Sequence, residues 1–273
     1  MRFFRPAMYL LTASLLAVAI VPPASSSARP DDKPLNELLG RTAEQMTKFV
    51  DQFSEVKCTE HVMQERFGKN DKVERRADAT YDYLVILSNA GGELSLDESR
   101  LEVQAPNKVK KSKDQSMPMM ISNGFATLFL IFHPYYAESF SFSSLGEEVL
   151  EGRRLAKVHF VHIRNTRSVA VLAVKGKEYP LDLSGTAWIE PETGRIARLE
   201  AGVTSDVEDI GMKALHSDIR FAPVRFGNKA SDYWYPVQAS VEVETPRQHW
   251  RNTHNFSDYK QFSVSTEQQV AKQ

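Results

Sequence analysis

Apolar and polar residues follow two different periods along this chain, and the change between them divides the sequence. From Pro34 to Phe53, apolar residues recur every three to four positions, which predicts an amphipathic helix with one buried face. Pro34 suits the first turn of such a helix. From Val56 onward the spacing becomes two, which is typical of strands with one buried face. We therefore expect one helix followed by a long β region.

Alternation is clearest in two long segments. In Val73–Ser88 small, aromatic and aliphatic residues alternate with Asp and Thr, and in Tyr233–Glu244 Tyr, Val and Ala alternate with Gln, Ser and Glu. Other segments bounded by turn-forming residues predict further strands. They are Val56–Phe67, Glu93–Val103, Ser139–Ser143, Glu147–Leu150, Arg154–Ile163, Leu183–Glu190, Arg195–Val203, Leu215–Phe221 and His249–Val264.

A second helix is predicted over Ser122–Phe132, in the middle of the β region. Phe125, Phe129 and Phe132 fall on one stripe, and Leu130 and Ile131 make the other side apolar as well. Pro134 lies just past its end, where a helix stops easily. Because it is apolar nearly all round, we expect this helix to be buried on most sides.

These elements do not alternate strand by helix, so a parallel sheet is not expected. We predict a mainly β (α+β) fold in which a single strongly curved antiparallel sheet forms a half-barrel. The N-terminal helix and the inserted apolar helix would cover its concave side. Residues 34–265 would form one domain, after a signal peptide (1–28) and a flexible leader (29–33), and before a polar tail (266–273).

The first 28 residues have the pattern of an export signal. Arg2 and Arg5 precede an apolar run over Ala7–Val21, and Ser26-Ser27-Ala28 offers small residues for cleavage. The run has about 15 residues, fewer than the roughly 20 that span a bilayer as a helix. We therefore expect a periplasmic or secreted protein, cleaved near Ala28 and not membrane-spanning afterwards.

Charge and cysteine content narrow the classes of partner. Residues 1–28 hold two of the 34 basic residues and none of the 35 acidic ones, so the mature formal net charge is −3. This lacks the dense cationic surface that binds nucleic acid. Cys58 is the single cysteine, so no intrachain disulfide forms and burial must stabilise the exported domain.

No short catalytic motif is present: the chain lacks G-x-S-x-G, H-E-x-x-H, a phosphate-binding glycine loop and a dinucleotide fingerprint. His159 and His162 are three residues apart on one predicted strand, so they lie on opposite faces and do not suit a shared metal. The same spacing separates Cys58 from His61, and we interpret Cys58 as a small buried residue. We predict no metal and no cofactor.

Glu190 and Glu192 flank Pro191 at a predicted turn. Two carboxylates facing across a cleft would be needed for glycoside hydrolysis. Turns carry polar residues for their own reasons, so we interpret these two as a solvated hairpin tip. We therefore expect no catalytic residue, and a protein that is not an enzyme.

Large aromatic residues occupy positions predicted to point inward. They are Tyr81, Tyr83, Phe125, Phe129, Phe140, Phe142, Tyr233 and Tyr235. Two alternatives remain open: these rings pack into a closed core, or they line a cavity for an apolar ligand. Empty space beneath Phe125 and Phe129 would favour the cavity, and tight packing there would favour the closed core.

The hairpin over Gly185–Leu199 reads G-T-A-W-I-E-P-E-T-G-R-I-A-R-L, and a closing strand contains N-F-S-D-Y over Asn255–Tyr259. With the overall order of elements, this resembles the lipoprotein-carrier (LolA/LolB-like) superfamily and its exported relatives of unassigned function. In that superfamily a half-barrel shields an apolar pocket under helices. The resemblance implies a non-enzymatic protein that binds an apolar or acyl ligand, a lipid or a lipidated partner. The alternative is an envelope protein–protein interaction module with a closed core.

Overall fold

The computed structural model describes residues 32–53, 56–90, 93–103, 125–174, 177–204, 211–226 and 229–261. The predicted signal peptide, the polar tail and the first residues of the predicted inserted helix lie outside these ranges. In chain order the elements are α1 (Asp32–Phe53), β1 (Val56–Phe67), η1 (Lys69–Asp71), β2 (Val73–Ala90), β3 (Glu93–Glu102), η2 (Phe125–Phe132), α3 (Pro134–Ala137), β4 (Phe140–Leu150), β5 (Arg153–His162), β6 (Val171–Val174), β7 (Lys177–Pro180), β8 (Leu183–Ile189), β9 (Ile196–Val203), β10 (Ala214–Phe226), β11 (Lys229–Glu244) and β12 (His249–Gln261).

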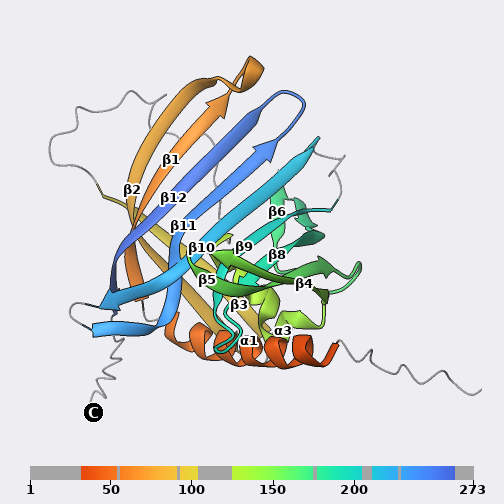
Figure 1. The fold of residues 1–273 in the computed structure, drawn as a ribbon. Coiled ribbons are helices and arrows are strands. Elements are labelled where there is room, and N and C mark those ends of the chain that lie inside the picture. Colours follow the sequence, from red (N-terminus) through yellow and green to blue (C-terminus); the bar gives the residue numbers. More distant parts are fainter. Residues whose placement is uncertain are drawn as a thin grey trace, which may run out of the picture.

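Ten of these strands form one antiparallel sheet in the order β3-β2-β1-β12-β11-β10-β9-β8-β5-β4 (Figure 1). β1 pairs with β12, so the first and last strands of the described chain are neighbours, third and fourth in the strand order. β6 and β7 form a separate two-stranded hairpin. Among the described residues β3 and β4 are edges, so the sheet is open. The predicted mainly β fold with one large antiparallel sheet is confirmed.

The strand predictions fail where the period of two is interrupted or too short. The two segments predicted on either side of Gly146 belong to one strand, β4. A register shift between Ser144 and Glu147, with Gly146 at φ +87°, keeps β4 continuous past the interruption. β6 and β7 were not predicted because four residues give too little alternation to recognise.

The apolar stripe predicted for the first helix forms the buried face of α1. Leu38, Met46, Phe49, Val50 and Phe53 are all less than 9% exposed. α1 contacts β2 and η2, and η2 contacts β9, β10 and β11. In Figure 1 α1 runs along one end of the sheet, with the light-green segment of η2 and α3 next to it. One continuous apolar core joins these helices to the sheet.

The inserted helix differs in type from an ordinary amphipathic helix. η2 is a 3₁₀ helix over Phe125–Phe132, and every side chain from Leu128 to Phe132 is buried. Runs of 3₁₀ helix longer than three or four residues are uncommon because their hydrogen-bond geometry is poorer than that of an α-helix. Burial of five consecutive apolar side chains therefore maintains a backbone form that is weak by itself.

Candidate functional site

Phe129 of η2 lies at the centre of the contact between the helices and the sheet. Its side chain is 1% exposed, and its ring centroid lies 4.8 Å from Phe49 and 6.1 Å from Phe221, both in edge-to-face geometry. Tyr235 of β11, also 1% exposed, lies 5.2 Å from Phe49. Such ring pairs add about 0.5–1.5 kcal/mol beyond their buried area. Two predicted cavity residues, Phe129 and Tyr235, thus meet through a residue of α1.

Phe140 and Phe142 of β4 belong to a second aromatic group. Their ring centroids are 6.4 Å apart, and Phe142 lies 5.3 Å from Phe132, the last residue of η2. Phe160 of β5 lies 6.0 Å from Phe140 and 6.1 Å from Phe132. η2 therefore carries one ring into each group: Phe129 into the first and Phe132 into the second.

The predicted tyrosines of β2 lie elsewhere on the sheet. Tyr83 is buried against Phe256 of β12, with ring centroids 5.5 Å apart, and its hydroxyl donates to Glu98 at 3.1 Å. Tyr81 is half-buried. The backbones of Phe125 and Tyr233 belong to η2 and β11, but their side chains lie outside the described part of the structure. The described members of the predicted set therefore fall into three neighbourhoods.

A small pocket lies beside Phe129 where α1, η2, β9, β10 and β11 converge. Met46, Phe49, Phe129 and Phe221 line its apolar side, and its free volume is about 20 Å³. This is room for one or two water-sized groups and far too little for an acyl chain. The space beside Phe129 is filled by the protein's own rings, which by the criterion above favours the closed core.

The hairpin tip between β8 and β9, which we interpreted as solvated, is only partly so, because it also docks on α1. Gly194 has φ +75°, and a Cβ there would lie 2.7 Å from the backbone of Arg41 and Thr42. Arg41 Nε donates to the carbonyl of Pro191 at 3.1 Å, while Glu192 is exposed. Glycine is needed because both its backbone angle and its closeness to α1 exclude a side chain. The Pro-x-Thr-Gly pattern thus fastens the helix to the sheet.

Glu190 serves the same turn. Its carboxylate accepts a hydrogen bond from the Thr193 hydroxyl, and its backbone N–H donates to the Arg195 carbonyl at 2.8 Å. Glu190 and Glu192 do not face each other across a cleft, because Glu192 lies on the exposed side of the tip. The interpretation of both as turn residues therefore holds, apart from the docking of the tip.

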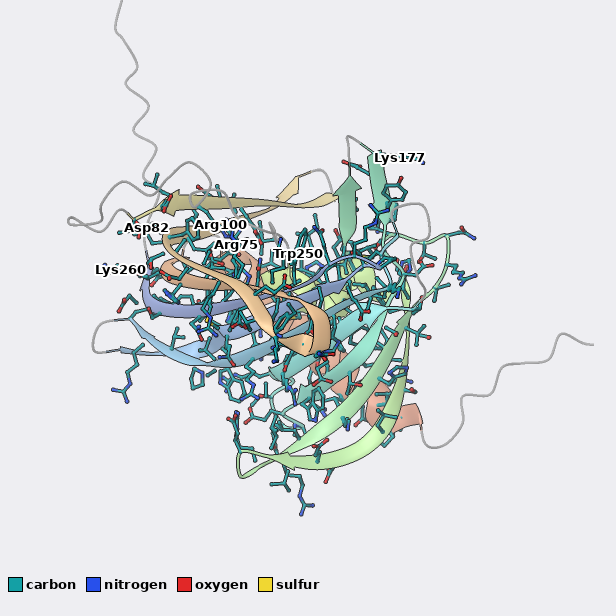
Figure 2. All side chains as sticks on the ribbon, turned by 90° about the horizontal axis from the view of Figure 1, so that it is seen from above. Arg75, Asp82, Arg100, Lys177, Trp250 and Lys260 are labelled. Carbon is teal, nitrogen blue, oxygen red and sulfur yellow. The ribbon has the colours of Figure 1, made fainter. Side chains whose placement is uncertain are left out.

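A buried charged cluster, which sequence reasoning missed, joins β1, β3 and β12. Glu60 is 0% exposed, and both of its carboxylate oxygens accept hydrogen bonds from Arg100. Arg100 Nε lies 2.7 Å from Oε2, and Arg100 Nη2 lies 3.1 Å from Oε1. His254 Nδ1 lies 2.8 Å from Glu60 Oε1, and Arg100 Nη1 donates to Glu98 at 2.8 Å. In Figure 2, Arg100 lies among the crowded side chains of the sheet.

The charges of this cluster stabilise each other. Burial by itself raises the pKa of Glu60, but hydrogen bonds from His254 and Arg100 outweigh it, so the pKa is lowered overall. Burial lowers the pKa of Arg100, but its bonds to Glu60 raise it further above the ordinary value. Carboxylate and guanidinium are therefore both charged near neutral pH, and the pair is a fixed structural bridge without a proton to exchange.

The position of Glu60 in the two-residue alternation of β1 could have indicated the cluster from the sequence. Glu60 lies between Cys58 and Val62 at the inward positions of β1, and a charge at an inward position needs a partner. The partners themselves could not be read from the sequence. Arg100 and His254 lie 40 and 194 residues away along the chain and become neighbours only through the strand order.

Cys58 has the surroundings of a core residue. It is 5% exposed, and burial raises the pKa of its thiol to about 12, so no thiolate forms near neutral pH. His61 is exposed on the opposite side of β1. The interpretation of Cys58 as a small buried residue is confirmed, and the pair cannot act as nucleophile and base.

The histidines of β5 are likewise separated. His162 is buried, with Nδ1 2.8 Å from Asp182, while His159 lies at a position of opposite parity. Among the described residues no three His, Cys, Asp or Glu side chains are placed to hold a metal ion together. No helix in the described part of the chain has the length and apolar character needed to cross a membrane.

Neither a family model nor a curated protein matches the sequence. The structure is similar to a DUF1329 family protein from Desulfovibrio piger, with a TM-score of 0.42 and 13% identity over 88% of this chain and 95% of that one. It is also similar to a domain described as an outer membrane lipoprotein-sorting protein from Vibrio parahaemolyticus, with a TM-score of 0.39 and 12% identity over 85% and 95%. It is also similar to lipoprotein LppX of Mycobacterium tuberculosis, with a TM-score of 0.27 and 14% identity over 82% of this chain and 96% of that one.

All three solved structures are less than 25% identical to this chain. Their TM-scores lie below 0.5, so they decide nothing about what this chain binds. Function resides in sites rather than folds, and has to be argued from the contacts of α1, η2 and the sheet.

Proposed function

We propose that this chain is an exported, non-enzymatic binding protein that holds an apolar or acyl chain, free or attached to a partner, between the sheet and the cover of α1 and η2. The observation that carries the proposal is η2, an apolar 3₁₀ helix whose Leu128–Phe132 side chains fill the space between α1 and the sheet. The bend of the sheet around this layer in Figure 1 supports the half-barrel arrangement.

The filled space beside Phe129 is compatible with reversible binding for an energetic reason. An apolar cavity costs about 24 cal/mol per Å³, so an empty acyl-sized space of about 300 Å³ would cost about 7 kcal/mol. That is comparable with the whole stability of a typical domain. A shell that takes up and releases an apolar chain therefore needs a plug to replace it. η2 meets this need, because its 3₁₀ backbone gives up little hydrogen-bond energy when it moves.

Binding of a fluorescent fatty acid, with native mass spectrometry for stoichiometry, tests the proposal. We expect 1:1 uptake by the wild type, and at least tenfold tighter uptake by Phe129→Ala, because the plug then competes less well. Phe256→Ala is the matched control, since Phe256 is a buried ring on β12 away from η2. If the wild type takes up no fatty acid, or if both variants gain affinity equally, the proposal that η2 acts as a plug is contradicted.

A second candidate is the interaction module with a closed core, which binds an envelope protein by an edge strand. The small free volume favours it, and so does β4, an edge that exposes Leu145 (52%) and Val149 (67%). Exposed edges offer unpaired backbone groups to a partner strand. Recovery of a stoichiometric protein partner, lost on Val149→Lys, with no lipid uptake, would support this candidate over the first.

Export and domain organisation complete the proposal. The signal over residues 1–28 supports removal near Ala28, and N-terminal sequencing of the mature protein from the periplasm or medium checks it. Limited proteolysis that leaves a single fragment close to residues 34–265 would support one domain.

A further inference from the structure

Arg195, immediately before β9, has a side-chain donor without an acceptor in the part of the chain that the structure describes. It lines the pocket beside Phe129, and its Nε is buried without a hydrogen-bond partner among the described residues. A buried donor left unsatisfied has lost its hydrogen bonds to water without a replacement, which destabilises the folded state. Native structures rarely keep such a group, and each instance calls for an explanation.

The surroundings of Arg195 do not supply the missing acceptor. Nη1 lies 3.9 Å from Glu190, at the outer limit of an ion pair, and Glu190 already accepts from the Thr193 hydroxyl. The turn holds the backbone of Arg195 firmly: its N–H donates to Thr193 Oγ1 at 3.2 Å, and its carbonyl accepts from the Glu190 N–H. The backbone of Arg195 is therefore fixed beside the pocket by a turn that is docked on α1, and the residue lines the pocket with a side chain that is 30% exposed.

The rest of the pocket is suited to an amphiphile. Gln45 of α1 and Arg195 provide polar groups, whereas Met46, Phe129, Phe221 and Trp234 provide an apolar wall. The volume of about 20 Å³ accommodates one or two oxygen atoms but no chain. One or two oxygens of a head group thus fit the pocket as it stands, while the rest of the ligand requires η2 to move.

We propose that this pocket binds the acidic head of an amphiphile, with carboxylate or phosphate oxygens accepting hydrogen bonds from Arg195 while the apolar chain takes the place of the η2 side chains. The inference rests on the proposed function and adds the class of ligand to it. A guanidinium binds such oxygens through charge-assisted bonds, which are about twice as strong as bonds between neutral groups.

Paired affinities for dodecanoate and dodecanol at pH 7.5 test the inference, because the two probes share a chain and differ in the head. The wild type should bind the acid at least tenfold more tightly than the alcohol. Arg195→Gln should abolish that preference and leave alcohol binding within about twofold. Arg154→Gln is the control: Arg154 lies on β5 with a side chain 75% exposed, so the same loss of charge should change nothing.

The outcomes separate the two levels of the argument. If neither probe binds the wild type, the proposed function fails and the head-group inference with it. If both bind equally, apolar binding stands and the inference is overturned. It is also overturned if Arg195→Gln keeps the preference for the acid. Arg195→Lys, which retains the charge but not Nε, should keep part of the preference for the acid.

Discussion

Around Phe129 the buried side chains are apolar rings from α1, η2 and the sheet, whereas around Glu60 they are charged groups from β1, β3 and β12. Both regions are packed against the same sheet. Apolar packing is non-directional, so another apolar group of similar volume can replace a ring at modest cost. Charge-assisted bonds are directional, and removing one partner leaves another buried charge unsatisfied.

The two regions therefore suit different roles. The Glu60 cluster links three strands of the sheet by hydrogen bonds. Any rearrangement would leave a buried charge unpaired, so this part of the sheet is expected to stay fixed. In the proposed function, the Phe129 region exchanges one apolar occupant for another, and η2 is the segment that moves. This contrast is what makes a binding function physically reasonable in a core that contains little free space.

The largest effect is expected from Glu60→Ala. It leaves Arg100 and His254 facing each other without the carboxylate, and we expect a loss of about 3–5 kcal/mol in the free energy of unfolding. Urea denaturation measures it. Glu74→Ala is the control, because Glu74 pairs with Arg66 at 3.3 Å on the exposed surface, where a pair contributes at most about 1 kcal/mol. If Glu60→Ala lowers the free energy of unfolding no more than Glu74→Ala does, the charged cluster does not stabilise this part of the sheet.

The acid dependence of stability should follow the same carboxylate. The pKa of Glu60 is lowered in the folded state, so its contribution is present above its unfolded value of about 4.3 and is lost as the pH falls through the folded pKa. The difference in unfolding free energy between wild type and Glu60→Gln should therefore shrink as the pH is lowered from about 5 through about 4.3 towards the folded pKa. A difference that stays constant over this range would argue against an ionised Glu60.

Substitution of Gly194 should weaken the docking of α1, and Gly152, which has a similar backbone angle, provides the control. Gly194 has φ +75° and abuts the backbone of α1, while Gly152 has φ +77° and would have no atom within 4 Å of an added Cβ. Gly152→Ala should cost about 1 kcal/mol, the penalty of a left-handed residue. Gly194→Ala should cost about 2–4 kcal/mol, because the clash adds to that penalty. Equal costs in thermal melts would show that the hairpin tip does not hold the helix.

Phe129→Met should be tolerated, in contrast to any change at Glu60. It keeps an apolar side chain of similar reach, so we expect a loss below about 1.5 kcal/mol. Chemical denaturation checks it beside Glu60→Gln, which also conserves shape. A loss above about 3 kcal/mol for the methionine variant would mean that the ring packing around Phe129 is as specific as the charged cluster.

The smallest effect, and the one of opposite sign, is expected at Arg195. Arg195→Met removes a buried donor that has no acceptor, so the protein should become more stable by about 1 kcal/mol. A residue that lowers stability in this way is typical of a site kept for binding. A destabilisation of similar size would indicate that Arg195 serves the fold.

The sequence by itself determined the type of each long element and the side that it buries. The change from a period of about 3.6 to a period of 2 located α1 and β1, and parity placed Cys58 and Tyr83 inside, because both depend only on local backbone geometry. The tertiary structure alone decided the partners. Glu60 and His254 meet because β1 lies beside β12, and Arg41 meets Pro191, 150 residues away, because the β8–β9 hairpin ends at α1. Strand order and docking follow from the packing of the whole chain, and no local pattern of residues contains them.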